Sequence, residues 1–302
     1  GSKPEAEELL KCRAALRCSE SKVIGNKLIF KGESQLQMLY RSSAGGLCTA
    51  EYELPFSQIM EITGAGEEST CDVYVVLTGL DCALDSGDGR TISVSMGLLA
   101  QAVVREERTL QMLTDVYSTA FQLTAESRTY TLGRLVEHGE KELTVREILE
   151  TGMLAQEVSD AYVTIGAITQ SRDGRRVTLT AEANVTVLYL TEDGARTSIT
   201  RQLQAACPLE LPEEASCSCH CGCTAPVFAT PTTGGIEVRF PVGFRYTAMT
   251  SRTTAAVSAV HMDEGTPRDH SGQPSIVLRM VGNGERLWDI AKSYGTTAQD
   301  IM

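Results

Sequence analysis

An internal repeat constrains the fold of this chain more than any other feature. Residues 7–40 and 146–189 each begin with an acidic segment rich in helix formers, continue through alternating apolar and polar residues, and end in an apolar-Leu-Tyr triplet. Residues 87–104 line up with residues 233–250 in the same order, and the separations between partners lie between 139 and 149 residues. Because self-similarity of this kind means that one structural unit occurs twice, we expect two related modules.

Apolar residues recur at every second position within both copies. The alternation runs through residues 28–40, 92–96 and 177–189, and glycine-bearing turns such as 43–47 and 232–236 separate the runs. Period two is typical of strands with one buried face, and such turns suit antiparallel neighbours. The sequence predicts a mainly β fold with two repeated antiparallel β-sandwich or open-barrel modules, short helices, and the partial βαα start of a further module.

Two segments read as helices on local signals. Residues 5–18 are good helix formers, and in residues 143–158 Thr144 and Glu147 have the spacing of a capping box before an apolar stripe. We expect a first module at 5–120, a linker and helix at 121–160, and a second module at 161–265. A linker at 266–275 and the partial module at 276–302 complete the expected order.

Charge and hydropathy exclude several classes of function. The net charge of −12 argues against a nucleic-acid or anionic-membrane partner, because both need a basic footprint. No run approaches the 18 apolar residues of a transmembrane helix, and the first twelve residues lack the apolar core of a signal peptide. We therefore expect synthesis in a reducing compartment.

The C-terminal segment 276–302 carries the most specific pattern. An apolar strand is expected up to Val281, then a Gly/Asn turn, a helix ended by Gly295, and a second helix capped by Thr296 or Thr297 with Asp300 in its first turn. The segment resembles the first part of a LysM domain, and the matching residues are Gly284, Leu287, Trp288, Ile290, Ala291, Tyr294, Gly295, Thr296 and Thr297.

Two departures from the LysM pattern lie in the turn, where Glu285 stands in place of Asp and Arg286 in place of Thr. The resemblance implies a ligand or partner contact formed by Asn283, Gly284, Glu285, Arg286, Leu287 and Trp288. Because the match covers only the first half of such a module, we expect residues 282–302 to be poorly ordered in isolation, or ordered only by packing elsewhere.

Two β repeats followed by a LysM-like segment resemble the spore-coat SipL family of endospore-forming Clostridia, which has tandem SPOCS domains before a LysM domain. The resemblance rests on "KGESQLQMLY" and "YELPFSQIMEI" in the first copy and on "TAEANVTVLYL" in the second. Leu54-Pro55-Phe56 matches a SPOCS strand, and the second copy lacks the Pro-Phe pair. The resemblance implies a structural coat protein in the mother-cell cytoplasm at the forespore surface, with a coat morphogenetic ATPase and other coat proteins as partners.

Four cysteines, Cys217, Cys219, Cys221 and Cys223, occupy alternate positions in the second copy. Their alignment with residues 71–77 has even offsets of 144 to 146, so they share the face of Cys71 and Val73, with His220 opposite. The favoured interpretation is a strand whose inner face is cysteine. Four such residues span about 20 Å, too far for one zinc ion. Metal binding by adjacent pairs and disulfides, including cross-links between subunits, stay open, and the four thiols are the redox or cross-link candidates.

No motif in the sequence indicates catalysis or a cofactor. His138 lies near Glu140 and Glu142 in a segment that reads as a polar loop. The sequence therefore predicts a non-catalytic scaffold of the spore coat that binds the ATPase and helps attach the coat to the forespore. The alternative is a cell-wall protein whose LysM segment binds N-acetylglucosamine polymers, and a weaker third class is a metal or redox protein. Self-association stays open.

Overall fold

The structure is a computed structural model that describes residues 3–85, 87–269, 271–272, 274 and 276–301. The chain divides into two compact units, of which the first holds residues 1–107 and 135–250 and the second holds residues 108–134 and 251–302. The first unit contains residues 5–107 and 161–250 of the two predicted modules, together with residues 135–160 of the predicted linker.

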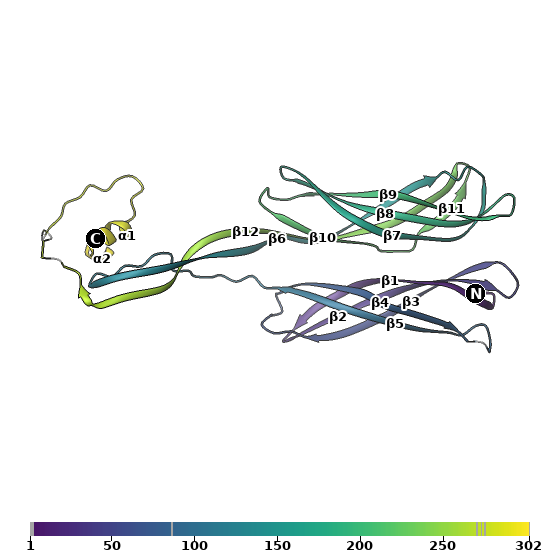
Figure 1. The fold of residues 1–302 in the computed structure, drawn as a ribbon, viewed down its shortest axis with the longest axis horizontal. Helices are drawn as coiled ribbons and strands as arrows, with labels where there is room; N and C mark the ends of the chain where they lie inside the picture. The colour runs from purple at the N-terminus through teal and green to yellow at the C-terminus, as the bar shows by residue number, and fades with distance from the viewer. Residues whose placement is uncertain (1–2, 86, 270, 273, 275, 302) are drawn as a thin grey trace. The chain divides into compact units, whose positions relative to one another are not determined.

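The first module consists of two antiparallel sheets (Figure 1). One is a three-stranded meander of neighbouring strands and the other is a hairpin, and their strands are β1 (Ala6–Ile24), β2 (Lys27–Ser42), β3 (Leu47–Glu61), β4 (Thr70–Leu84) and β5 (Ile92–Arg105). Leu28, Phe30, Leu36 and Met38 on the inner face of β2 are buried, as the period-two pattern predicts.

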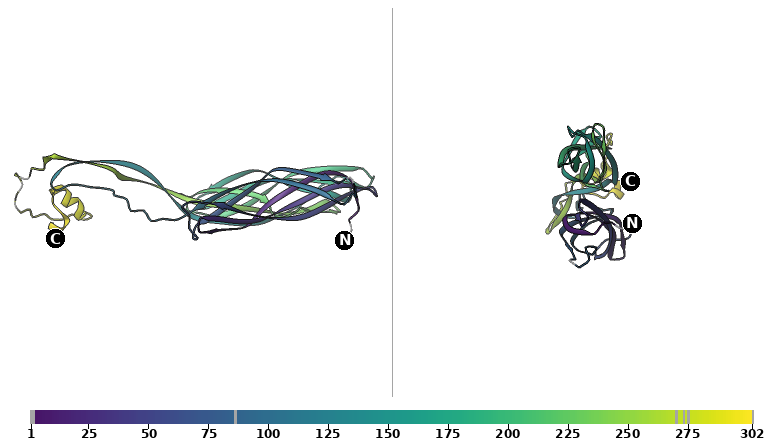
Figure 2. Two further views of the ribbon diagram at one scale, coloured as in Figure 1. Left: turned by 90° about the horizontal axis from the view of Figure 1, so that it is seen from below. Right: turned by 90° about the vertical axis from the view of Figure 1, so that its right-hand side faces the viewer.

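The second module repeats the meander and enlarges the other sheet. Its strands are β7 (Ala155–Asp173), β8 (Arg176–Thr191), β9 (Arg196–Glu210), β10 (Ser216–Cys223), β11 (Phe228–Thr232), β12 (Gly235–Pro267) and β6 (Phe121–Leu149), which also pairs with β12. In the view along the strands, those of each module wrap around a common interior (Figure 2). The predicted mainly β fold is confirmed.

The two meanders are equal in strand length and spacing. The paired strands have 19, 16 and 15 residues in both modules. Each strand of the second meander begins 149 residues after its counterpart, at Ala155 against Ala6, Arg176 against Lys27 and Arg196 against Leu47. The separation of 139 residues expected for the first segments is therefore wrong.

The helices expected at 5–18 and 143–158 are also wrong. Residues 6–18 lie within β1, and the predicted capping box of Thr144 and Glu147 lies within β6. Helix propensity is a weak prior that tertiary pairing overrides. Both segments carry a second signal of period two. Cys12 and Ala14 in β1, and Leu143 and Val145 in β6, pack inward in their modules. Because most of the surrounding residues are also good helix formers, this alternation is hard to recognise in the sequence.

The second unit contains the far ends of β6 and β12 and two short helices. The helices are α1 (Leu287–Tyr294) and α2 (Ala298–Ile301), which lie near the C-terminal end of the chain (Figure 2). Gly295 ends α1 in the left-handed conformation at φ 64°, and the Thr297 hydroxyl accepts a hydrogen bond from the Asp300 backbone N–H, both as predicted. The strand expected at 276–281 is wrong, because its described residues pair with no strand. None of the described helices is long and apolar enough to cross a lipid bilayer.

Candidate functional site

A buried carboxylate lies where the two modules meet. Asp72 on β4 projects from the face opposite Cys71 and Val73, and its side chain is only 1% exposed. The Arg105 guanidinium of its own module donates to Asp72 Oδ2 at 2.7 Å. The second module contributes His138, whose Nε2 lies 3.3 Å from Asp72 Oδ1, and the Thr247 hydroxyl, 3.4 Å from Oδ2. A buried charge is stable only with such partners, so Asp72 ties the modules together.

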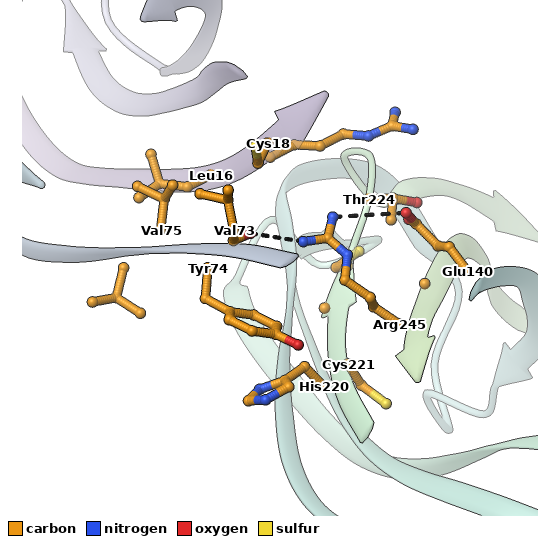
Figure 3. A pocket seen from close by; sticks show the side chains of 15 residues that line it. Leu16, Cys18, Val73, Tyr74, Val75, Glu140, His220, Cys221, Thr224 and Arg245 are labelled. Carbon is orange, nitrogen blue, oxygen red and sulfur yellow. Dashed lines mark hydrogen bonds and ion pairs between the residues drawn. The ribbon is translucent and has the colours of Figure 1, made fainter. Parts of the chain in front are cut away.

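Arg245 on β12 makes a second link beside Asp72. Its guanidinium donates to the Val73 carbonyl at 2.8 Å, lies 3.7 Å from a Glu140 carboxylate oxygen, and sits over the Tyr74 ring at 5.9 Å (Figure 3). Tyr74 in turn packs on His220, with ring centroids 4.1 Å apart. Burial, and then the Asp72 carboxylate, raise the pKa of Tyr74. These side chains border a cavity of about 250 Å³.

A third link joins the two meanders. Arg13 on β1 forms a two-pronged ion pair with Asp160 on β7, with N···O distances of 2.9 and 2.5 Å. Arg13 and Lys11 also lie over the Tyr162 ring, each 4.3 Å from its centroid. A hydrogen bond with Thr186 lowers the pKa of Tyr162, and the nearby Lys11 acts in the same direction against burial. The bidentate Arg–carboxylate geometry fixes relative orientation as well as distance.

The four cysteines of β10 lie on one face of the strand, as predicted. Cys217, Cys219, Cys221 and Cys223 pack against the core of the second module, and His220 lies on the other face against Tyr74. The thiols of Cys219 and Cys221 are 3.7 Å apart, and the hydrogen bond between them lowers the pKa of Cys219 and raises that of Cys221.

None of the ten cysteines, all within the described residues, takes part in a disulfide. Across those residues no group of three or more His, Cys, Asp or Glu side chains has a metal-binding arrangement. The interpretation of β10 as a strand with an inner cysteine face is confirmed in its geometry. Its use in cross-linking stays a prediction.

The predicted contact residues in the C-terminal segment form one exposed turn and the start of α1. Gly284 has a φ of 87°, and Glu285 accepts a hydrogen bond from the Gly282 backbone N–H at 2.8 Å. Arg286 pairs with Asp289 at 3.0 Å, while Asn283 is exposed and Leu287 is half-buried. Their binding role stays a prediction.

Trp288 has partners that the sequence did not indicate. Its indole N–H donates to Asp115 Oδ2 at 2.8 Å, and its ring meets Tyr117 edge-on with centroids 4.9 Å apart. Lys292 also donates to Asp115, at 2.6 Å, and the hydrogen bonds from Lys292 and Trp288 lower the pKa of that carboxyl. Helix α1 therefore packs on Asp115 and Tyr117, and the expectation for the order of residues 282–302 stays a prediction. No pattern in the sequence of the irregular segment around Asp115 indicates that it contacts helix α1.

The loop expected around His138 is wrong, since His138 lies in strand β6. One ring nitrogen faces Asp72 and the other lies 3.4 Å from the Thr247 hydroxyl. Both nitrogens are engaged in the junction between modules, so the residue has a structural part there.

Comparison with known proteins gives one match. Residues 5–85, which contain β1 to β4, match the family model described as "SipL, SPOCS domain". No curated protein and no solved structure matches the chain. The matched domain family is coat-associated and non-catalytic, which supports a role related to sporulation and the spore coat.

Proposed function

We propose that the chain is a non-catalytic scaffold of the endospore coat, which binds a coat morphogenetic ATPase and helps attach the coat to the forespore surface in the mother cell. The observation that carries the proposal is the SPOCS match at residues 5–85, over a module whose meander recurs 149 residues later. A second SPOCS domain at 155–250 and a LysM segment at the C-terminal end are parts of the same proposal.

The junction between the modules supports a scaffold role. A scaffold has to present its binding surfaces in a fixed arrangement, whereas interfaces within a chain allow relative motion unless they are well tied. Asp72, Arg245 and the Arg13–Asp160 pair supply directional contacts across this junction. Such contacts specify orientation more than they add net stability.

The exposed turn before α1 supports a partner contact. Arg286 has a side chain that is 77% exposed and carries positive charge on a chain of net charge −12. Trp288 beside it is 39% exposed, and Trp and Arg are enriched among residues that dominate binding energy. We propose that this turn, Asn283–Trp288, contacts the ATPase.

The test is a binding titration of the purified chain with the ATPase. Arg286→Glu should weaken binding about tenfold or more, because it reverses a charge at the proposed contact. Arg146→Glu is the matched control, since Arg146 is 69% exposed and also forms one ion pair, but in the second module. The ATPase contact is wrong if the parent chain shows no binding, and the turn is excluded if both variants bind alike.

The exposed face of Trp288 also favours one alternative, the LysM-type binding of N-acetylglucosamine polymers. Sedimentation with purified peptidoglycan separates the two functions. A chain that pellets with peptidoglycan, loses this on Arg286→Glu and ignores the ATPase would replace the scaffold proposal by the glycan-binding one.

A further inference from the structure

Four of the five cysteines of the first module lie on two strands that belong to different sheets. Cys12 and Cys18 lie on β1, and Cys71 and Cys82 lie on β4. The two strands pack against each other across the module (Figure 1). This placement differs from that of β10, where the thiols follow one another along a single strand.

Cys12 and Cys82 share one cluster of the core. Both pack against the buried residues Leu36 and Met38, so the two side chains approach from opposite sheets. Burial, and then the hydrogen-bonding contact with Cys82, raise the pKa of the Cys12 thiol to about 12. The two half-buried thiols therefore contact each other.

The other two cysteines on β1 and β4 have different contacts. Cys18 and Cys71 pack against a second cluster of the core. The Cys18 thiol points to the Lys31 carbonyl at 3.5 Å and the Glu20 carbonyl at 3.7 Å, and a hydrogen bond with Ser21 acts on Cys71. These thiols face backbone and hydroxyl groups, which makes them a comparison pair within the same module.

We propose that Cys12 and Cys82 are an oxidative modification site, at which a disulfide oxidant links the two sheets of the first module. Bridging requires the two Cα atoms to lie within about 7 Å of one another. Two contacting thiols on packed strands are candidates for such a bridge. Cys219 and Cys221 meet this distance limit, since residues two apart on a strand are about 6.6 Å apart, but their side chains leave one strand in parallel, which disfavours the geometry of a disulfide.

The reaction is a thiol–disulfide exchange with a small disulfide such as oxidised glutathione. One thiolate of the pair attacks a glutathione sulfur, breaks the glutathione disulfide and releases one glutathione thiolate. The second thiolate then attacks the protein sulfur of the mixed disulfide and releases the other glutathione thiolate. The two protein protons end on the two glutathione molecules, so two thiols are oxidised and one disulfide is reduced.

Peptide mapping of the oxidised full chain reads the link directly. Trypsin releases Cys12-Arg13 apart from Cys18–Lys22, and a protease that cleaves before aspartate releases Asp81–Leu84 with Cys82 alone. After treatment with oxidised glutathione and blocking of free thiols, the expected species is Cys12-Arg13 linked to Asp81–Leu84. A link of Cys18 to Cys71 in its place, or glutathione adducts without any link between β1 and β4, would overturn the proposal.

Thermal unfolding gives a second readout. A link between residues 12 and 82 closes a long loop, so the oxidised parent chain should melt more than about 5 °C above the reduced chain. Cys12→Ala and Cys82→Ala should abolish this shift. Cys48→Ala is the matched control, because Cys48 packs against the same cluster, and it should keep the shift. If either alanine variant fails to fold, the peptide map of the parent chain still decides the question.

Discussion

The two modules share their strand order but differ in the continuity of their cores. In the second module one cluster runs from Val177 through Ala183 to Tyr189 on β8 and meets β12 from Ile236 to Ala248, with Phe240 and Phe244 fully buried. The first module has two separate clusters, one around Leu36 and Met38 and the other around Leu28 and Phe30. The same topology therefore carries two different packing solutions.

The cause lies at the middle of equivalent strands. Ala181 and Ala183 on β8 are replaced, 149 residues earlier, by Gly32 and Ser34 on β2. At Gly32 the Phe56 ring and the Arg17 carbonyl occupy the space that a Cβ would need, each 2.3 Å from it. The buried Ser34 hydroxyl meets the Met96 sulfur at 3.3 Å. A glycine and a polar residue thus interrupt the apolar row that is continuous in the second module.

Register adds to the difference. The hairpin of β4 and β5 has a register shift between Leu77 and Gly79, whereas β10 pairs with β12 without a shift. A bulge bends and twists the strand that carries it. The inner residues of β4 are therefore divided between the two clusters, with Cys71 and Val75 in one and Leu80 and Cys82 in the other.

The largest expected effect comes from truncating a core aromatic in each module. Phe244→Ala and Phe30→Ala should each lower the free energy of unfolding by about 3–5 kcal/mol, since both side chains are at most 2% exposed. The distribution of faster hydrogen exchange along the chain should differ between the two variants. Hydrogen exchange should accelerate throughout 176–248 for Phe244→Ala, but mainly near residues 23–30 and 71–75 for Phe30→Ala. Module-wide acceleration in both variants would contradict the divided core.

A methyl group at Gly32 tests the interruption itself. Gly32→Ala should lower the free energy of unfolding by about 1–3 kcal/mol, because its Cβ would overlap the Arg17 carbonyl and the Phe56 ring. Urea unfolding measures the change. The additional substitution Phe56→Leu should restore part of the lost stability, because leucine leaves free some of the space that the Phe56 ring occupies. If Gly32→Ala alone is stabilising, the close approach is not a feature of the folded module.

The junction between the modules is tested by Asp72→Asn. This change removes the charge that faces Arg105 and His138 while keeping the side-chain shape, and it should lower the free energy of unfolding by about 1–3 kcal/mol. Hydrogen exchange of the backbone amides should accelerate at Thr247 and near His138, both on the second module. Asp81→Asn on the exposed face of the same strand is the control. If Asp72→Asn and Asp81→Asn lower the free energy of unfolding equally, Asp72 does not link the two modules.

The sequence predicted what depends on short-range alternation. Strands β2 and β8, the inner face of the cysteine strand and the αL position of Gly295 follow from local pattern and turn chemistry. It misassigned residues 6–18, because Ala, Leu, Lys and Glu favour a helix locally while pairing with β2 decides the outcome. The strand expected at 276–281 failed for the converse reason: β-type residues alone form no strand without a partner.

The candidate contacts between modules could not be predicted in the same way. Arg13 and Asp160 are 147 residues apart in sequence, and Asp72 and Thr247 are 175 apart. In a strand, charged residues at alternate positions read as a solvated face, and only the packing of a second module buries them. Asp115 and Tyr117 illustrate the same limit, since their irregular segment acquires a role only through contact with Trp288.

The smallest expected effect concerns pH and separates Cys219 from the thiols of the first module. Burial first of all raises the pKa values of Cys12, Cys18 and Cys71 in the folded first module, whereas the Cys221 hydrogen bond lowers that of Cys219 in the second. A thiol whose folded pKa is raised contributes stability that is complete below its unfolded value of about 8.5 and declines as pH rises toward the folded value. For Cys12 the decline extends to about pH 12.

Between pH 8.5 and 10.5 the free energy of unfolding should therefore fall less steeply with pH in Cys12→Ala than in the parent chain. The difference in slope is at most about 1.4 kcal/mol per pH unit, and solvent screening of the half-buried thiol makes it smaller. Cys219→Ala should act below about pH 8.5 instead, because a lowered folded pKa adds stability only as pH rises toward the unfolded value, and the variant should lose that gain. Urea unfolding of the parent and both variants at matched pH values isolates these differences from the titration of lysine and tyrosine. Parallel curves for the two variants would show that Cys12 and Cys219 occupy equivalent environments, which the opposite directions of their pKa shifts argue against.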